Sequence, residues 1–448
     1  MAVEREGGVT PQPPSLTSRA VSTYSANLAV AALSFVNVIV SARTLGVAGR
    51  GDVAFLTAIA TLSANFALFG ISEANANFGG SRPEERPSLF TNSLLFAVGF
   101  GTLAIGCVAV LVVVFPDVGG DSVGWLRWIA LGAIPVLILQ AYLQLLAQAE
   151  YGFRITNIAW VVGPVTNVVA NVALAVAGRI TVASVVVTWV IGQTLGVLLL
   201  VWHLGSRRGG VGSVDLALAR RSLSFGAKSH LGRVMMVGNY RLDQWILGAV
   251  SGSRQLGLYS VAVAWAETLF YLPTSLVMAQ RPDLVRASGS DARRQAMAGF
   301  RAAFVLTATL GVGLIVLAPL FIVPVFGSEF RGAITDLRIL TAGAFGIVAL
   351  KVFSAVLTAQ RQPLRGSAGV GVALIATIVL DVLLIPPFGD KGAAIASTIA
   401  YSIGGLAMAW IFVRVLGGTL RDLVPMRSDV DVIWSEGTRR LRRRKPGS

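Results

Sequence analysis

The residues with the clearest chemical potential lie in a segment that is otherwise long and apolar enough to cross a bilayer. Within residues 224–249, apolar side chains are interrupted by four basic ones, Lys228, His230, Arg233 and Arg241. An ionisable group at the depth of the hydrocarbon core costs at least about 2.5 kcal/mol, so such groups usually face a bundle interior or a wet cavity. The spacing of His230, Arg233 and Arg241 places them on one helical face. This segment predicts one wall of a cationic cavity, with polar contacts that only fix helix packing as the alternative.

A second set of polar residues lies in the middle of other apolar segments. Gln140, Gln144 and Gln148 recur every four residues, so they form a polar stripe along one helix face. Asn27 and Asn171 add further amides at membrane depth. For these amides, contact with a ligand and hydrogen bonding between helices are equal alternatives.

Acidic residues at membrane depth are few. They are Glu73, Asp243, Glu267 and Asp381. An acid at this depth either neutralises a neighbouring arginine or carries a coupling cation. Asp243 lies two residues from Arg241 and therefore on a different helical face, so it needs a partner elsewhere. Glu267, in the middle of a helical segment, is the stronger candidate for ion coupling.

The composition is that of a polytopic membrane protein. Of 448 residues, 54% are hydrophobic and only 13% are charged, against about 25% charged residues in soluble domains. A net charge of +15 would suggest nucleic-acid binding in a soluble protein, but the basic residues lie between apolar segments, so no nucleic-acid partner is expected. The single cysteine and two histidines match no disulfide or metal-binding pattern, and no cofactor is predicted.

Apolar segments of spanning length predict an all-α membrane fold with about twelve transmembrane helices. Their approximate ranges are 18–40, 52–78, 89–115, 125–148, 157–178, 181–204, 223–249, 257–281, 299–326, 333–359, 367–386 and 392–416. The connections between them are short and turn-like, so no soluble domain is inserted.

The distribution of basic residues predicts the orientation of the chain. With a cytoplasmic N-terminus, roughly 24 Lys and Arg residues fall in cytoplasmic segments and about 8 in outer segments. Both termini of this multi-pass protein are therefore expected on the cytoplasmic side of the cell membrane. The basic end, RRLRRRK, either attracts anionic headgroups or is a solvated tail that enforces the topology.

The two halves of the sequence resemble each other at an offset of roughly 210 residues. Residues 125–148 align without gaps with the segment that begins at Asp336, which places Lys351 at the position of Gln140. Because each half holds six helices, an even number, the halves share one topology and should be related by an axis along the membrane normal. Ligand sites in such proteins lie near the bilayer midplane between the repeats.

The expected architecture is therefore two six-helix lobes around a central cationic cavity. Its parts are a cytoplasmic tail (1–17), an N-lobe (18–204), an interlobe linker (205–222), a C-lobe (223–416) and a basic cytoplasmic tail (417–448). The glycine-containing linker is expected to be a flexible tether that lets the lobes tilt.

Three motifs resemble those of a known family. A hairpin of polysaccharide transporters is similar to residues 45–58, LGVAGRGDVAFLTA. The counterpart of this hairpin in the second half of those transporters is similar to residues 239–267, NYRLDQWILGAVSGSRQLGLYSVAVAWAE. PFGDKGAAIA (387–396) is similar to their closing helix–turn unit. Over nearly the whole chain, the sequence resembles the polysaccharide or O-antigen flippase branch of the multidrug/oligosaccharidyl-lipid/polysaccharide exporter superfamily.

This resemblance implies a transporter and not an enzyme. Its substrate would be a polyprenyl-pyrophosphate-linked oligosaccharide, moved by alternating access from the cytoplasmic to the outer leaflet for cell-surface polysaccharide biosynthesis. The pyrophosphate would then be bound by basic residues, since guanidinium groups bind oxyanions bidentately: Arg233, Arg241, Lys228, His230 and Lys351. Glycan hydroxyls would be bound by Gln140, Gln144, Asn27 and Asn171, and an ion would be coupled at Glu267 or Asp243.

Two other transport functions stay open, a cation-coupled exporter of small drug-like molecules and a flippase for a lipid II-type precursor. The first should present acids and aromatic rings to its ligand, whereas the cavity residues here are net cationic. The second is weakened because the additional helices of peptidoglycan-precursor flippases are absent. Expected partners are the lipid-linked glycan and anionic membrane lipids, with polysaccharide polymerase or assembly proteins as a further hypothesis.

Overall fold

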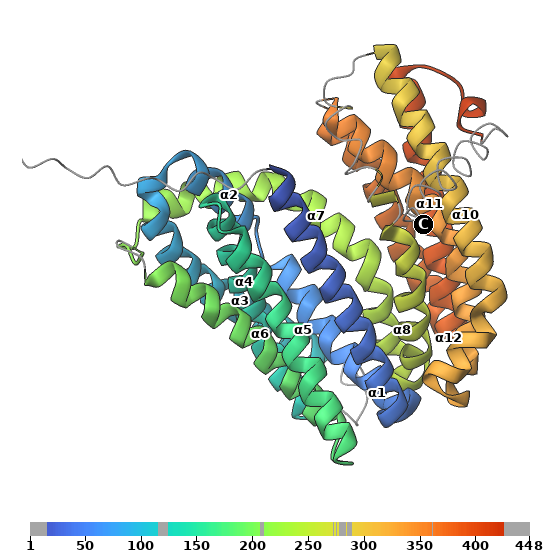
Figure 1. Ribbon diagram of the computed structural model, residues 1–448, viewed down its shortest axis with the longest axis horizontal. Coiled ribbons are helices and arrows are strands. Elements are labelled where there is room, and N and C mark those ends of the chain that lie inside the picture. The colour runs from blue at the N-terminus through green and yellow to red at the C-terminus, as the bar shows by residue number, and fades with distance from the viewer. Residues whose placement is uncertain are drawn as a thin grey trace, which may run out of the picture.

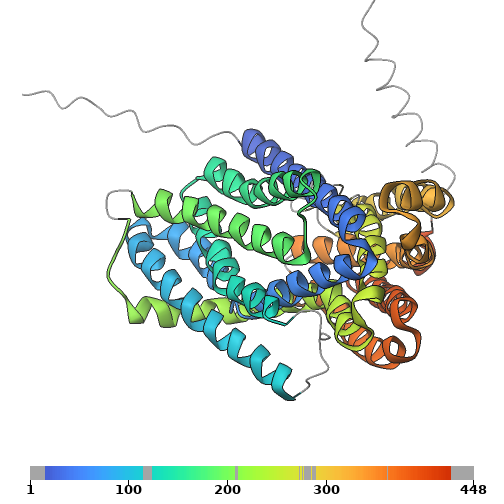
Figure 2. The same cartoon turned by 90° about the horizontal axis from the view of Figure 1, so that it is seen from below.

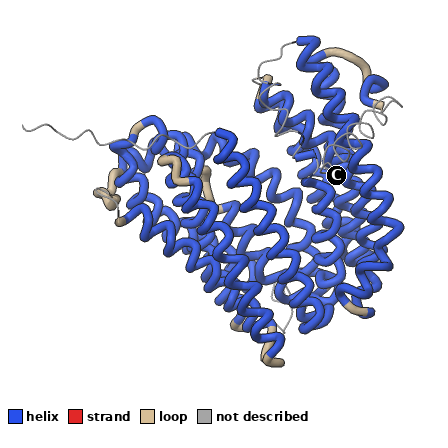
Figure 3. The backbone as a smooth tube through the Cα atoms, viewed as in Figure 1, coloured by secondary structure: helices blue, strands red, loops and turns tan. Residues whose placement is uncertain are grey.

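All secondary structure in the described part of the chain is helical. The computed structural model describes residues 16–114, 124–206, 210–271, 273, 274, 276, 284, 289–360 and 362–424, and Figure 3 shows only helices and loops among them. The α-helices are α1 (Leu16–Phe66), α2 (Ile71–Ser81), α3 (Arg86–Val114), α4 (Leu126–Ala149), α5 (Phe153–Val176), α6 (Val182–Gly205), α7 (Leu216–Val250), α8 (Gly252–Ala266), α10 (Gly289–Phe326), α11 (Ala333–Ala359) and α12 (Pro363–Leu416). Short 3₁₀ turns are η1 (Pro83–Glu85), η3 (Glu267–Phe270), η4 (Ser328–Gly332) and η5 (Leu420–Leu423).

Eight described segments are long and apolar enough to cross a membrane. Two of them, in α1 and α12, are interrupted at Gly46 (φ 67°) and Gly389 (φ 58°), in a backbone conformation that glycine adopts without steric cost. Each of these therefore folds as two helices joined at a tight turn. With α7 and α8, which are not among these eight segments, the described residues contain twelve long helical segments, and the expectation of about twelve transmembrane helices is met in part.

The helices form two groups. Figure 1 shows α1–α6 on the left and in the centre, and α8–α12 on the right. The groups meet at the lower edge of this view and diverge toward the upper edge. The view from below in Figure 2 shows the same separation, with blue to green helices on one side and yellow to red ones on the other.

The groups meet where two turns pack against each other. A Cβ atom on Gly51 would lie 1.7 Å from the Ser253 carbonyl oxygen, and one on Gly257 would lie 2.0 Å from that of Val47. Ser253 follows Val47 by 206 positions, and Gly257 follows Gly51 by the same 206. The two contacts are therefore reciprocal, as in an interface around a two-fold axis. This geometry supports the internal repeat predicted from the sequence.

Three further hydrogen bonds join the two groups at the same end of the molecule. The Arg43 guanidinium in α1 donates to the Val325 carbonyl at 2.7 Å and also contacts the Pro324 carbonyl in α10. The Ser253 hydroxyl donates to the Asp52 carboxylate. Backbone contact and side-chain bonds together hold the two groups in register at this end.

The segment before α7 is fixed to the first group. The Gly212 amide donates to the Pro87 carbonyl at 3.1 Å, and Thr91 Oγ1 donates to the Gly212 carbonyl at 2.8 Å. Asn92 Nδ2 donates to the Asp215 carbonyl at 2.8 Å. The flexible tether expected over residues 205–222 is thus replaced, in its described part, by a segment that pairs with α3.

Helix α7 passes from one group to the other. Near its start, Arg221 forms a 2.7 Å ion pair with Glu85 of the first group. Further along, Asn239 Nδ2 donates to the Val370 carbonyl of α12 at 3.0 Å. The change of partner falls later than the lobe boundary expected at residue 223, because the first turns of α7 pack on α2 and α3.

Candidate ligand-binding site

A break between α1 and α2 sets the position of the acid that faces the α7 cations. Phe69 (φ 44°) and Gly70 (φ 68°) interrupt the helix, and the carbonyls of the last turn of α1 need donors from elsewhere. The Tyr142 hydroxyl donates to the Leu68 carbonyl at 2.9 Å. His230 Nε2 lies 2.9 Å from the Phe66 carbonyl and donates to it.

His230 is therefore a packing residue in this structure. Its side chain is buried and its ring stacks on Phe69 with centroids 5.9 Å apart. Lys228, two residues earlier, is exposed, and its side chain makes no hydrogen bond within the described residues. Of these two residues, only Lys228 is open to an approaching anion.

Arg233 is paired with an acid of the first group. Its Nη2 and Nε lie 2.8 Å and 3.2 Å from Glu73 Oε1. The Ser72 hydroxyl donates to the other Glu73 oxygen at 2.7 Å. Both side chains stay accessible, at 39% for Arg233 and 27% for Glu73, so the pair lies at the edge of open space.

Arg241 and Lys351 gather separately in the second group. Arg241 Nη1 and Nη2 contact the two Glu267 carboxylate oxygens at 2.6 Å and 3.3 Å. Lys351 Nζ donates to Thr274 Oγ1 at 2.8 Å and lies 5.8 Å from the centre of the Tyr240 ring. The predicted cations thus form two arginine–glutamate sites along α7, and Glu267 is the counter-ion of Arg241.

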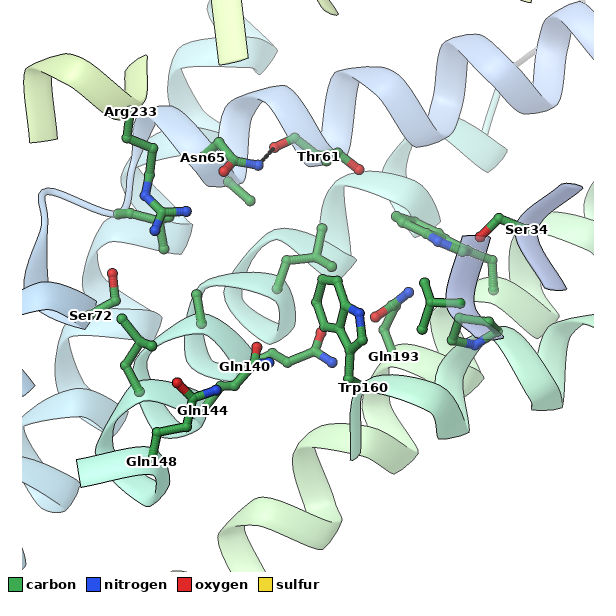
Figure 4. A pocket seen from close by; sticks show the side chains of 18 residues that line it. Ser34, Thr61, Asn65, Ser72, Gln140, Gln144, Gln148, Trp160, Gln193 and Arg233 are labelled. Carbon is green, nitrogen blue, oxygen red and sulfur yellow. Dashed lines mark hydrogen bonds between the residues drawn. The ribbon is translucent and has the colours of Figure 1, made fainter. Parts of the chain in front are cut away.

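A polar cavity of about 410 Å³ lies within the first group. α1, α2, α4, α5 and α6 line it, and Arg233 of α7 closes one end. Figure 4 shows Arg233 and Ser72 at that end, the glutamines of α4 in the middle, and Trp160, Gln193 and Ser34 toward the other end. The cavity brings Arg233 together with the predicted glutamine stripe.

The glutamines that line this cavity have no hydrogen-bond partner among the described residues. They are Gln140, Gln144 and Gln148 of α4 and Gln193 of α6. None of the four amides forms a hydrogen bond within the described part of the chain. Amides normally find donors and acceptors, so these four are arranged toward water or a ligand.

Asn27 and Asn171, the other predicted glycan contacts, do not line this cavity. Asn27 is exposed on α1. Asn171 is buried, donates to Asn37 Oδ1 at 2.7 Å and accepts from Thr188 Oγ1 at 2.9 Å, which ties α5 to α1 and α6. For Asn171 the structure therefore shows helix packing.

Among the lining residues that the sequence analysis did not single out are Trp160, Trp189 and Gln193. Trp189 and Gln193 are four residues apart on α6, so an aromatic ring and an amide share one helical face. This spacing is a signal comparable to the Gln140–Gln148 stripe and would have identified the second wall.

A buried acidic pair lies in the second group. Asp243 accepts from the Tyr259 hydroxyl at 2.5 Å, the Ser397 hydroxyl at 3.0 Å and the Gln244 amide at 2.7 Å. Asp381 is fully buried beside it, and neither of its carboxylate oxygens has a hydrogen-bond donor among the described residues. The partners that the sequence analysis required for Asp243 are thus two hydroxyls and one backbone amide, and a second acid lies next to it.

The repeat supplies a neutral counterpart of this pair in the first group. Asn37, Asn171 and Thr188 precede Asp243, Asp381 and Ser397 by 206, 210 and 209 positions. The amides satisfy each other, as described above, whereas the acids leave Asp381 without a donor. At equivalent positions of the repeat, the first half therefore has a complete hydrogen-bond network, and the second half has an incomplete one among the described residues.

Comparison with solved structures defines the class of fold. The chain matches an inward closed structure of the lipid II flippase MurJ with a TM-score of 0.74 and 15% identity, over 91% of this chain and 89% of that one. It matches inward-facing and outward-facing MATE multidrug transporters of the MOP superfamily with TM-scores of 0.67 and 0.56 at 16% and 14% identity. These matches cover 88% and 89% of this chain and 98% and 94% of the others. The fold is that of a MOP-superfamily membrane transporter.

The sequence then identifies the family. Residues 40–335 match the family described as "Polysaccharide biosynthesis protein", and the chain belongs to it. No curated protein sequence matches significantly. The protein is thus a member of the polysaccharide biosynthesis family, with several helices long enough to cross a membrane and with the fold of the MurJ and MATE transporters.

Proposed function

We propose that the protein flips a polyprenyl-pyrophosphate-linked oligosaccharide from the cytoplasmic to the outer leaflet. The observation that carries this proposal is the accessible Arg233–Glu73 pair at the end of a cavity lined by unpartnered amides. The arginine offers a fork for pyrophosphate and the amides offer donors and acceptors for sugar hydroxyls. Membership of the polysaccharide biosynthesis family supports the same class of substrate.

Before substrate binds, the positive charge of Arg233 and that of Arg241 are each paired with a glutamate carboxylate. Removing the partner of a desolvated charge is strongly destabilising, whereas exchange for another anion is not. Pyrophosphate would therefore replace Glu73 on Arg233 and Glu267 on Arg241, with Lys351 and Lys228 as further cations on the path. The path itself lies between the two groups, along the face of α7 that carries both arginines.

Alternating access would use the contact between the two turns as its outer gate. With the positive-inside orientation, both termini are cytoplasmic and the turns around Gly51 and Gly257 lie on the outer side. The structure would then be closed outside, which agrees with its higher TM-score against the inward-facing than the outward-facing MATE transporter. Anionic lipids and the polysaccharide assembly machinery are the proposed partners at the cytoplasmic face; the basic tail lies mostly outside the described residues.

Ion coupling is proposed at Asp243 together with Asp381, in preference to Glu267. An ionised carboxylate that is buried without a partner is very costly, so Asp381 would hold a proton or share a monovalent cation with Asp243. Glu267, by contrast, is already neutralised by Arg241. The coupling ion would thus bind in the second group of helices, while the glycan binds beside the first group.

Export of small organic cations is the second candidate, because MATE multidrug transporters share the fold. Its cavity should contain an acid to attract the cation. The cavity of the first group is instead lined by amides, hydroxyls, apolar groups and one arginine. A lipid II-type substrate, suggested by the lipid II flippase, is chemically close to our proposal and differs in the head group.

The proposal is tested by reconstitution into liposomes that contain a fluorescent polyprenyl-pyrophosphate N-acetylglucosamine in the inner leaflet. An impermeant lectin outside should quench the label as the protein moves it, and the Arg233→Ala plus Arg241→Ala variant should not support quenching. Transport of rhodamine-type cations without any movement of the pyrophosphate lipid would replace our proposal by the drug-exporter alternative.

A further inference from the structure

We propose that the cavity of the first group is a binding site for a neutral or N-acetylated sugar, held between the ring of Trp160 and the glutamines of α4 and α6. This inference rests on the proposed function and deepens it, because it assigns the pyrophosphate and the first sugar to adjoining parts of one site. The sugar would thus bind inside the first group of helices, not in the space between the groups.

The order of residues along the cavity matches the order of groups in such a ligand. Arg233 lies at one end, next to Ser72 (Figure 4). Gln140 and Gln144 follow, and Trp160 lies beyond them. A pyrophosphate on Arg233 would therefore direct its first sugar past the glutamines and onto the tryptophan ring.

Shape and size fit one ring and its substituents. A cavity of about 410 Å³ is within the range of roughly 300–1,000 Å³ typical of small-molecule pockets. A whole oligosaccharide would not fit there, so the remaining sugars would extend out of the cavity. Specificity would accordingly concentrate on the sugar next to the pyrophosphate.

The amides supply directional recognition. Each glutamine side chain presents a carbonyl acceptor and two N–H donors, the complement of a hydroxyl or an N-acetyl group. The amides of Gln140, Gln144, Gln148 and Gln193 have no hydrogen-bond partner in the described part of the chain, so a ligand meets them without breaking internal bonds. A sugar that satisfies them gains the bonds at little structural cost.

The tryptophans supply an apolar surface. Trp160 is 38% exposed and extends into the cavity, and Trp189 is a second aromatic residue that lines it. The electron-rich face of an indole attracts the polarised C–H groups on the flat side of a pyranose ring. Amides at the rim of an aromatic ring thus recognise both the polar edge and the apolar face of one sugar.

Charge decides between classes of sugar. Arg233 is the only charged residue among those that line the cavity in the described chain, and in the complex it is engaged by pyrophosphate. A uronic acid would then bury a carboxylate with no cation to pair with, which is costly. The site therefore favours a neutral hexose or an N-acetylhexosamine.

The test measures binding of three soluble probes to the purified full chain in nanodiscs. The probes are farnesyl pyrophosphate and its derivatives linked to N-acetylglucosamine or to glucuronic acid. We expect the N-acetylglucosamine derivative to bind about tenfold tighter than farnesyl pyrophosphate, and the glucuronic acid derivative to show no such gain. Trp160→Ala should remove the gain and leave the affinity for farnesyl pyrophosphate unchanged, whereas Trp160→Phe should keep most of it.

Trp202→Ala is the matched control, because Trp202 is 67% exposed on α6 and does not line the cavity. Arg233→Ala should weaken binding of all three probes. Equal affinities of the three probes for the unmodified protein, or an unchanged sugar gain in Trp160→Ala, would overturn the sugar site while leaving the flippase proposal intact. Failure of every probe to bind would instead count against the proposed function itself.

Discussion

The contact between Gly257 and the Val47 carbonyl offers a direct way to disturb one state of the transport cycle. The Cβ atom of an alanine at position 257 would lie 2.0 Å from the Val47 carbonyl oxygen and 2.9 Å from its carbon. Non-bonded carbon atoms approach to about 3.5 Å, so the two turns would have to separate by about 1 Å or more. The steric penalty exists only while the turns touch.

Overpacking of this kind costs about 1–3 kcal/mol. Since the penalty falls on the outward-closed state alone, Gly257→Ala should shift the equilibrium away from that state by about 5- to 150-fold. Gly313→Ala is the matched control, because Gly313 lies on α10 of the same half and a Cβ there meets no atom within 4 Å.

The assay is the distance between spin labels at Ser81 and Arg365, placed in a Cys107→Ser background. Both residues are exposed and lie at the ends of helices, one in each group, and the orientation predicted from the basic residues puts these ends on the cytoplasmic side. Gly257→Ala should transfer population from the longer to the shorter distance, and Gly313→Ala should leave the distribution unchanged. An unaltered distribution in Gly257→Ala, or the same shift in both variants, would refute the assignment of this contact as the outer gate.

Three further predictions concern the ligand site, the acidic pair and the break before α2. Arg233→Ala should weaken binding of farnesyl pyrophosphate by about 10- to 100-fold, the loss of a charged hydrogen bond, and Arg233→Lys should restore only part; equal affinities would make Arg233 a packing residue. Asp381→Asn should abolish the dependence of lipid transport on an ion gradient but retain downhill movement in liposomes, and gradient-driven transport in this variant would exclude Asp381 from coupling. Tyr142→Phe should destabilise the fold by about 0.5–1.5 kcal/mol, seen as a lower Tm, because the bond from its hydroxyl to the Leu68 carbonyl is lost while the Ile71 amide still donates to that carbonyl; an unchanged Tm would show that the break needs no such support.

Much of the fold could be predicted from the sequence because a membrane helix is recognised from a local stretch of apolar residues. Apolar length sets the spans, and the offset of roughly 210 residues gives the repeat, which the reciprocal contacts of Gly51 and Gly257 support. The joined helices in α1 and α12 were placed as separate spans, since the glycines at 46 and 389 mark their turns. Where α7 changes partners was not foreseeable, because its first turns contact distant residues of α2, η1 and α3.

The candidate site was predicted in kind but not in arrangement. The cations of α7 and the glutamines of α4 stand out because polar groups at membrane depth are rare. The counter-ions of these cations could not be predicted. Glu73 and Arg233 are 160 residues apart, and no local pattern relates them. His230 illustrates the same limit, since its bond to the Phe66 carbonyl depends on a helix break that is visible only in three dimensions.

The repeat also explains how one frame serves two purposes. Gln140 in the first half occupies the position of Lys351 in the second, and Asn171 that of Asp381. The first half thus carries neutral amides where the second carries ionisable groups. Gln140 lines the proposed sugar site and Asn171 joins helices of the first half, so neither role needs a change of charge, whereas the paired acids suit the proposed ion-coupling site. Helix α7 bonds to both halves, through Arg233 on one side and Arg241 on the other, and so joins the two groups alongside the contact between the turns at Gly51 and Gly257.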